Sequence, residues 1–199
     1  MARTDATRKS SAPHPNSFDK LRTTPLPAGV GGSRRDTPGK KENRRPAGHR
    51  EIAGRLDGRG LRIGVAVARF NEYVTRQMLE IALARLAELG VRASDVTVVW
   101  VPGSFELPLA SKKLAEMPGT DAVIALGAVI RGETAHFEHV AYGASQGIAR
   151  VAEETGKPVI FGVLTTSNAG QAVARIGHAR GYAEAAVEMA NAYRALETA

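Results

Sequence analysis

One stretch of the sequence combines groups that could hold an anion with a group that could move protons. Residues 127–140 read GAVIRGETAHFEHV, so an apolar run ends in a charged glycine turn. Gly132 permits a tight turn, after which the N–H groups of Glu133 and Thr134, with the Thr134 hydroxyl, could hold an anion at a helix start. His136 falls in the first turn of that helix, where the positive helix end favours a neutral imidazole that can accept a proton. The pattern predicts an anion cradle beside an acid/base group.

A plainer explanation for His136 also stays open, because many histidines only complete a local hydrogen bond. His139 lies on the same helical face but lacks the turn, so the plainer explanation is stronger there. No further ligand-type side chains accompany this pair at metal-binding spacing, so we expect no metal. The chain has no cysteine, which excludes thiolate ligands and fits a reducing compartment, so we expect a cytoplasmic protein.

Two other short stretches place unusual side chains after apolar runs. In ARFNEYVT, Phe70 could stack on a planar heterocycle or only cap the core, and Asn71 could cap the next helix or bind a ligand amide edge. In VPGSFELP, the Pro-Gly turn directs Ser104, Phe105 and Glu106 outward, next to the free N–H groups of a helix start. Both stretches are candidate ligand contacts.

A further stretch, FGVLTTSNAGQAVARIG, follows the last apolar run. Thr166, Ser167 and Asn168 are typical of a helix start, and Arg175 lies near the end of the short helix that would follow. The Arg175 guanidinium could face solvent or bind a phosphate through two hydrogen bonds. Solvent is the more common position for such a side chain.

The elements that must position these residues alternate along the chain. Short runs rich in Val and Ile predict strands buried on both faces, and segments with apolar residues at steps of three and four predict helices between them. This alternation predicts a three-layer α/β sandwich with a four-stranded parallel sheet, whose ligands bind beyond the carboxyl ends of the strands. The predicted strands are 61–68, 95–101, 121–130 and 158–164, and the predicted helices centre on 79–89, 106–117, 140–151 and 181–197.

The first 50 residues have a different character. They contain 12 of the 27 Lys and Arg residues and four of the 20 Asp and Glu residues, so the net charge of +7 belongs to this segment. It lacks a periodic apolar face, and we expect a disordered tail over residues 1–50 and one domain over 51–199. The segment could be a solvated extension or a nucleic-acid-binding arm. The extension is favoured, because no aromatic residues alternate with the basic ones as in nucleic-acid-binding segments. We expect no signal peptide, no membrane span and no nucleic acid partner.

Taken together and in order, these motifs resemble 6,7-dimethyl-8-ribityllumazine synthases over residues 51–199. The similarity is carried by ARFN, WVPGSFELPLASKKLA, DAVIALGAVIRGETAHFEHV, GIA, KPVIFGVLTT and EMAN. The resemblance implies a flavodoxin-like fold and a transferase of riboflavin biosynthesis. That enzyme condenses 5-amino-6-(D-ribitylamino)pyrimidine-2,4-dione with 3,4-dihydroxy-2-butanone 4-phosphate and releases phosphate and water, without a cofactor.

The resemblance also implies roles for individual residues. His136 would be the general acid/base, and phosphate would be bound by Glu133, Thr134, Arg175 and Arg180, although the compressed loop before Arg180 departs from the family pattern. The pyrimidinedione and its ribityl chain would meet Phe70, Asn71, Ser104, Phe105, Glu106, Val129, Ile130 and Phe161.

The resemblance further implies a homo-oligomer, a pentamer that stays free or assembles into a shell of sixty subunits. Phe161 and Arg175 would then reach the site from the neighbouring subunit. The segment EIAGRL, 51–56, would form an N-terminal strand that pairs with the neighbour's sheet. Riboflavin synthase is a candidate partner. Two alternatives stay open, a flavin- or lumazine-binding protein without turnover and a shell-forming protein whose tail recruits a partner.

Overall fold

Four apolar segments form the parallel sheet that the sequence predicts. The computed structural model describes residues 49–199, in which the strands are β1 (Ile63–Ala68), β2 (Val96–Val101), β3 (Ala122–Ile130) and β4 (Val159–Thr166). They lie in the order β2-β1-β3-β4 and every pair is parallel. This order is that of flavodoxin-like sheets, so the predicted fold class is confirmed.

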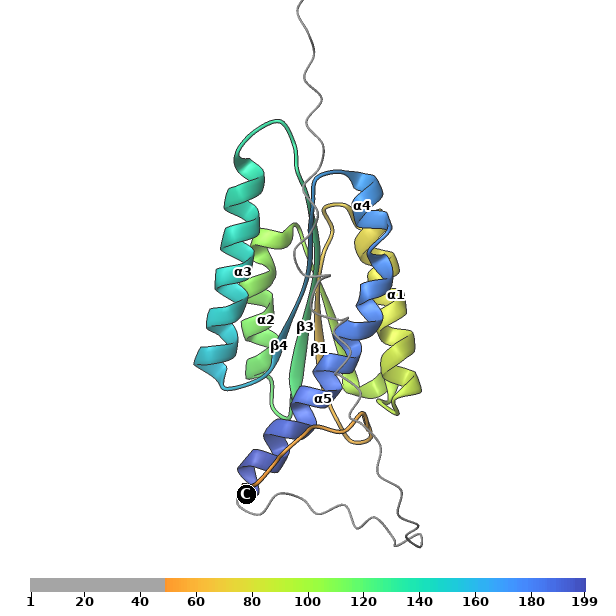
Figure 1. Ribbon diagram of the computed structural model, residues 1–199, viewed down its shortest axis with the longest axis vertical. Coiled ribbons are helices and arrows are strands. Elements are labelled where there is room, and N and C mark those ends of the chain that lie inside the picture. The colour runs from red at the N-terminus through yellow and green to blue at the C-terminus, as the bar shows by residue number, and fades with distance from the viewer. Residues whose placement is uncertain (1–48) are drawn as a thin grey trace, which may run out of the picture. The chain divides into compact units, whose positions relative to one another are not determined.

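Helices cover both faces of the sheet, which gives the three predicted layers (Figure 1). One face carries α2 (Leu107–Glu116) and α3 (His136–Thr155), and the other carries α1 (Glu72–Glu88), α4 (Ala169–Val173) and α5 (Ala179–Glu197). Short 3-10 helices complete the connections: η2 (Ala93–Asp95), η3 (Ser104–Glu106) and η4 (Ile176–His178).

Helix ends follow the signals in the sequence. The Asn168 side chain accepts a hydrogen bond from the Gln171 backbone N–H at 2.9 Å, so the predicted helix start before α4 is confirmed. Gly90 follows α1 at φ 95° and Gly156 ends α3 at φ 63°. This left-handed conformation suits glycine, which has no Cβ to clash with the following carbonyl.

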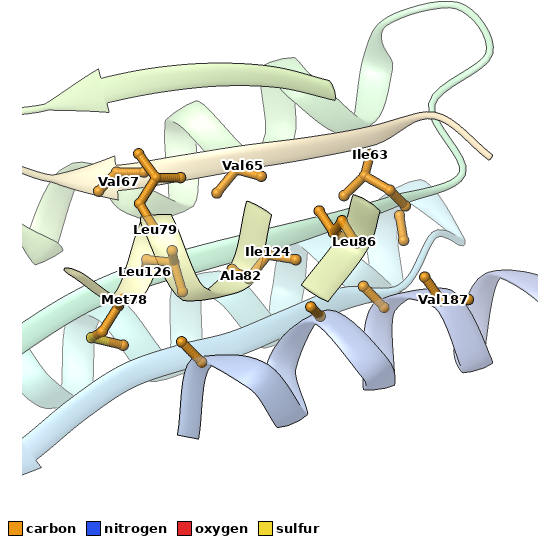
Figure 2. Packing of buried hydrophobic residues seen from close by; sticks show 14 of the residues in the cluster. Ile63, Val65, Val67, Met78, Leu79, Ala82, Leu86, Ile124, Leu126 and Val187 are labelled. Carbon is orange, nitrogen blue, oxygen red and sulfur yellow. The ribbon is translucent and has the colours of Figure 1, made fainter. Parts of the chain in front are cut away.

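The core lies against the central strand β1, whose six residues are all buried. Figure 2 shows how side chains of β1 and β3 meet α1 and α5, with Val65 and Ile124 facing Ala82 and Leu86. Burying one side chain of the size of Leu86 contributes about 1.5–3 kcal/mol. A second apolar cluster between the sheet and α2 and α3 fills the opposite face, so the strand ends are held from both sides.

The prediction that every strand is buried on both faces is wrong for β2, and in part for β4, the other edge strand, where Phe161 and Thr165 are exposed. The misfit is larger for β2. Its residues alternate between partly buried and exposed, and only Val101 is buried. β2 is an edge strand, and the Arg76 guanidinium lies over the Trp100 ring, 5.0 Å from its centroid. An edge strand has a neighbour on one side only, which is why its side chains are half exposed in a single chain.

The beginning of the described chain, residues 49–61, runs along α5. The Asn191 side chain donates to the backbone carbonyls of Arg55 and Asp57 at 2.7 and 2.9 Å, which ties this segment to the helix. Pairing of residues 51–56 with a neighbouring subunit stays a prediction, and the predicted tail lies outside the described residues except at its last two positions. Among residues 49–199, no helix is both long and apolar enough to cross a membrane.

Candidate active site

A cavity of about 640 Å³ opens at the carboxyl ends of β1, β2 and β3. This is the edge of the sheet where the sequence predicts ligand binding. Most of its walls are apolar, with a few polar groups among them, as in typical small-molecule sites. The lining residues come from the three strand-to-helix junctions and the first turns of α3: Phe70, Pro102, Gly103, Ser104, Phe105, Glu106, Ala128, Val129, Ile130, Gly132, Thr134, His136, Phe137, His139 and Val140.

The junction between β1 and α1 presents Phe70 to the cavity. The ring is 72% exposed, so it is available to a ligand instead of capping the core. Its backbone is held, because the Phe70 N–H donates to the Pro102 carbonyl at 2.9 Å and the preceding Arg69 N–H donates to Val101 at 2.8 Å. An exposed aromatic ring on a fixed backbone can stack on a planar heterocycle.

The junction between β2 and α2 forms the adjoining wall. The Glu106 carboxylate accepts a hydrogen bond from the Gly103 N–H at 2.9 Å, which closes the turn after Pro102. Ser104 is only 4% exposed, and its hydroxyl lies close to Gly127 of β3. The Phe105 ring packs on Gly143 of α3, where a Cβ atom would come within 2.6 Å of the ring. Glycines on two neighbouring elements therefore set the depth of this wall.

The junction between β3 and α3 brings the polar groups. His136 is the first residue of α3, as the sequence predicts, and both it and Thr134 line the cavity. Glu133 stands between two lining residues, Gly132 and Thr134, but does not itself line the cavity. Free N–H groups at this helix start and the Thr134 hydroxyl can hold an anion beside the imidazole.

An ion pair fastens the start of α3 to the end of β3. The Arg131 guanidinium lies 4.5 Å from the Phe137 ring centroid and pairs with the Glu138 carboxylate. The pKa of Glu138 lies below its usual range, first because its own backbone N–H donates to it and then because of Arg131. Glu138 therefore stays ionised and keeps the pair intact at neutral pH.

His139 lines the cavity together with His136, although its sequence context supported a role in the site less strongly. The spacing of three residues already predicts the shared helical face, and the structure brings both side chains to the cavity. Within residues 49–199, no group of three or more His, Asp or Glu side chains is arranged to hold a metal ion.

Several predicted site residues do not line the cavity of this single chain. Asn71 turns its side chain to the Ala128 carbonyl, and Phe161 lies on β4 with 39% of its surface exposed. Arg175 donates to the Gln171 carbonyl at 3.0 Å. Arg180 lies 3.1 Å from a carboxylate oxygen of Glu88 and 3.5 Å from one of Glu184, on the helix pair α1 and α5.

Comparison with known proteins covers most of this described region. A family model described as 6,7-dimethyl-8-ribityllumazine synthase matches residues 60–194. A curated 6,7-dimethyl-8-ribityllumazine synthase of Thermus thermophilus is 54% identical over 122 residues, which are 61% of this chain and 78% of that protein. The matched region contains all three junctions that form the cavity.

Proposed function

This chain belongs to the 6,7-dimethyl-8-ribityllumazine synthase family, and we propose that it carries out the family's condensation in the cavity described above. The reaction joins 5-amino-6-(D-ribitylamino)pyrimidine-2,4-dione to 3,4-dihydroxy-2-butanone 4-phosphate, forms 6,7-dimethyl-8-ribityllumazine and releases phosphate and water. The enzyme is therefore a transferase of riboflavin biosynthesis. The observation that carries the proposal is the family match over residues 60–194, within which the predicted contacts Phe70, Ser104 and His136, from three separate junctions, line one cavity.

The pyrimidinedione ring stacks on Phe70 and meets the backbone of Val129 and Ile130 at its edge. Support comes from the exposed Phe70 ring and from the position of all three residues on the same cavity. The edge of a pyrimidinedione alternates donors and acceptors, which backbone N–H and C=O groups at a strand end can match.

The ribityl chain lies along the wall formed by Ser104, Phe105 and Glu106. This wall offers a hydroxyl, a carboxylate and an aromatic face, which suit a chain of hydroxyl groups on a carbon backbone. One Glu106 oxygen already accepts from the Gly103 N–H, so the carboxylate is oriented before the ligand arrives.

The phosphate of the second substrate binds the N–H groups of Glu133 and Thr134 and the Thr134 hydroxyl. Support comes from the helix start at His136, since helix N-termini favour anions. This position puts the leaving group next to the imidazole. Arg180 as a further phosphate ligand stays a prediction, and it would have to leave the carboxylates of Glu88 and Glu184 to reach phosphate.

His136 serves as the general acid/base. Imine formation, loss of phosphate and ring closure each move protons, and one imidazole beside both substrates can serve several of these steps. Such a group contributes about 10²- to 10⁴-fold to the rate. Much of the remaining acceleration comes from holding the amine and the ketone in reacting geometry between Phe70 and the phosphate cradle.

The neighbouring subunit of a homo-oligomer completes the site. Phe161 and Arg175 do not line the cavity of their own chain, which supports their delivery to a neighbour, Phe161 against the ring and Arg175 on phosphate. Residues 51–56 would pair with the neighbour's sheet. We propose a pentamer in the cytoplasm for the domain 51–199, with residues 1–50 as an extension. A shell of sixty subunits and a contact with riboflavin synthase stay predictions.

Mixing the purified protein with both substrates tests the proposal. Growth of the lumazine absorbance at a rate proportional to protein concentration is the expected result. A folded protein that binds the pyrimidinedione but yields no product under saturating substrates would overturn the proposal in favour of a binding protein without turnover. The family match favours the enzyme over that alternative.

A further inference from the structure

The position of Phe70 is set by its backbone more than by packing of its ring. With 72% of its surface exposed, the side chain gains little from neighbours that could hold it in place. Only Arg69, Phe70 and Asn71 separate β1 from α1, so the chain reverses direction within three residues. Whatever fixes this turn therefore fixes the Cα–Cβ bond from which the ring projects.

Hydrogen bonds tie this turn to strands on both sides. On one side, the N–H groups of Arg69 and Phe70 donate to the carbonyls of Val101 and Pro102 at the end of β2. On the other side, the Asn71 side-chain amide donates to the Ala128 carbonyl of β3 at 2.8 Å. The pairing of β1 with β3 extends to Val67 opposite Leu126, so the Asn71 amide continues the contact with β3 beyond the strand.

The backbone of Asn71 has a left-handed conformation, φ 62° and ψ 42°. It is the one residue other than glycine with positive φ among residues 49–199. Gly accepts this conformation but has no side chain to donate, and Asp accepts it but an ionised carboxylate cannot donate. Asn both accepts the left-handed backbone and supplies a side-chain donor. This side chain makes no capping hydrogen bond to α1, so the predicted cap role is not the one it fills.

Ala128 directly precedes Val129 and Ile130, the two residues proposed to meet the edge of the pyrimidinedione. The bond from Asn71 to Ala128 therefore joins the part of the site that stacks on the ring to the part that meets its edge. We infer that Asn71 is a positioning residue that fixes Phe70 relative to the end of β3, and that it acts on substrate affinity through Phe70 instead of touching the substrate. This inference rests on the function proposed above.

Binding of the pyrimidinedione alone, measured by calorimetry, tests the inference without requiring turnover. Asn71→Gly keeps the left-handed backbone and removes the donor, and we expect about three- to tenfold weaker binding, the effect of one hydrogen bond. Asn71→Asp should weaken binding at least as much. In steady-state assays the loss should appear in KM for the pyrimidinedione with kcat nearly unchanged.

A matched control separates this effect from general destabilisation. Gly156→Ala puts alanine at φ 63° in open space at the far end of α3, so it imposes left-handed strain away from the cavity. We expect this variant to bind the pyrimidinedione as the native chain does. Asn71→Ala, which combines strain with loss of the donor, should bind more weakly than Gly156→Ala.

A double-mutant cycle with Phe70→Ala decides whether Asn71 acts through the ring. If it does, Asn71→Gly changes the dissociation constant less than about twofold once Phe70 is absent, because the two effects are not additive. Unchanged affinity in Asn71→Gly, or equal weakening with and without Phe70, would overturn the inference alone. Failure of the native chain to bind the pyrimidinedione would overturn the proposed function and this inference with it.

Discussion

Replacing Gly127 with alanine should disturb the core and one wall of the cavity together. Gly127 lies in β3, where a Cβ atom would come within 2.6 Å of the Ser104 hydroxyl oxygen and 3.0 Å of a Leu107 methyl carbon. Carbon contacts are favourable at about 3.5–4.0 Å, so both atoms would have to move. Neither side chain has free space, since Ser104 is 4% exposed and Leu107 is fully buried.

The cost follows from overpacking a filled interior. Extra methyl groups in such positions cost about 1–3 kcal/mol of the free energy of unfolding. For a domain of this size, each kcal/mol lowers the melting temperature by about 2–4 °C, so Gly127→Ala should lower it by about 2–12 °C. Displacement of Ser104 should also raise KM for the pyrimidinedione, because Ser104 begins the turn proposed to line the ribityl chain.

Thermal unfolding and steady-state kinetics check both parts. Gly177→Ala is the matched control, because a Cβ atom there meets nothing within 4 Å and the backbone does not have positive φ. It should unfold and react like the native chain. Removing the Ser104 hydroxyl with Ser104→Ala in the Gly127→Ala background should restore part of the lost stability. A Gly127→Ala protein with unchanged melting temperature and unchanged KM would refute the reasoning.

Three further predictions follow from individual contacts. Phe70→Ala should weaken pyrimidinedione binding by about 1–3 kcal/mol, the value of one aromatic stack on a base, while the melting temperature stays unchanged because the ring is 72% exposed; calorimetry and thermal unfolding check this. Asn168→Ala should cost about 1 kcal/mol of stability in urea unfolding through loss of the α4 cap, whereas Asn168→Asp should keep it. The pKa of Glu154 lies below its usual value of 4.5 because Lys112 donates a hydrogen bond to it. Its contribution to stability is therefore present above pH 4.5 and lost as the pH falls through the lowered pKa, so acid unfolding of Glu154→Gln should converge with that of the native chain at low pH.

The sheet, its main helices and most of the cavity could be predicted because local patterns determine them. An apolar run such as DAVIALGAVI indicates a strand that is buried on both faces. The carboxyl ends of parallel strands then lie together at one edge of the sheet. That edge gathers Phe70, Ser104 and His136, which are far apart in the sequence. The burial of β2, and to a lesser extent that of β4, was overpredicted, because apolar composition does not reveal which strands lie at the edges of the sheet.

The rest depends on contacts between distant residues, which composition and spacing do not encode. The hydrogen bond from Asn71 to Ala128 joins residues that are 57 positions apart in the sequence. The sequence predicted a helix cap or a ligand contact for Asn71, and not this bond. Arg180 meets a carboxylate of α1 only because α1 and α5 pack side by side on the same face of the sheet.

The central claim is that His136 moves protons for the condensation in this cavity. The most direct test is the condensation rate under saturating substrates for His136→Ala and for His139→Ala, two histidines one helical turn apart on the same cavity. His136→Ala should react about 10²- to 10⁴-fold more slowly than the native protein, and His139→Ala should be slowed far less. A His136→Ala protein that folds and condenses the substrates at the native rate would contradict the account.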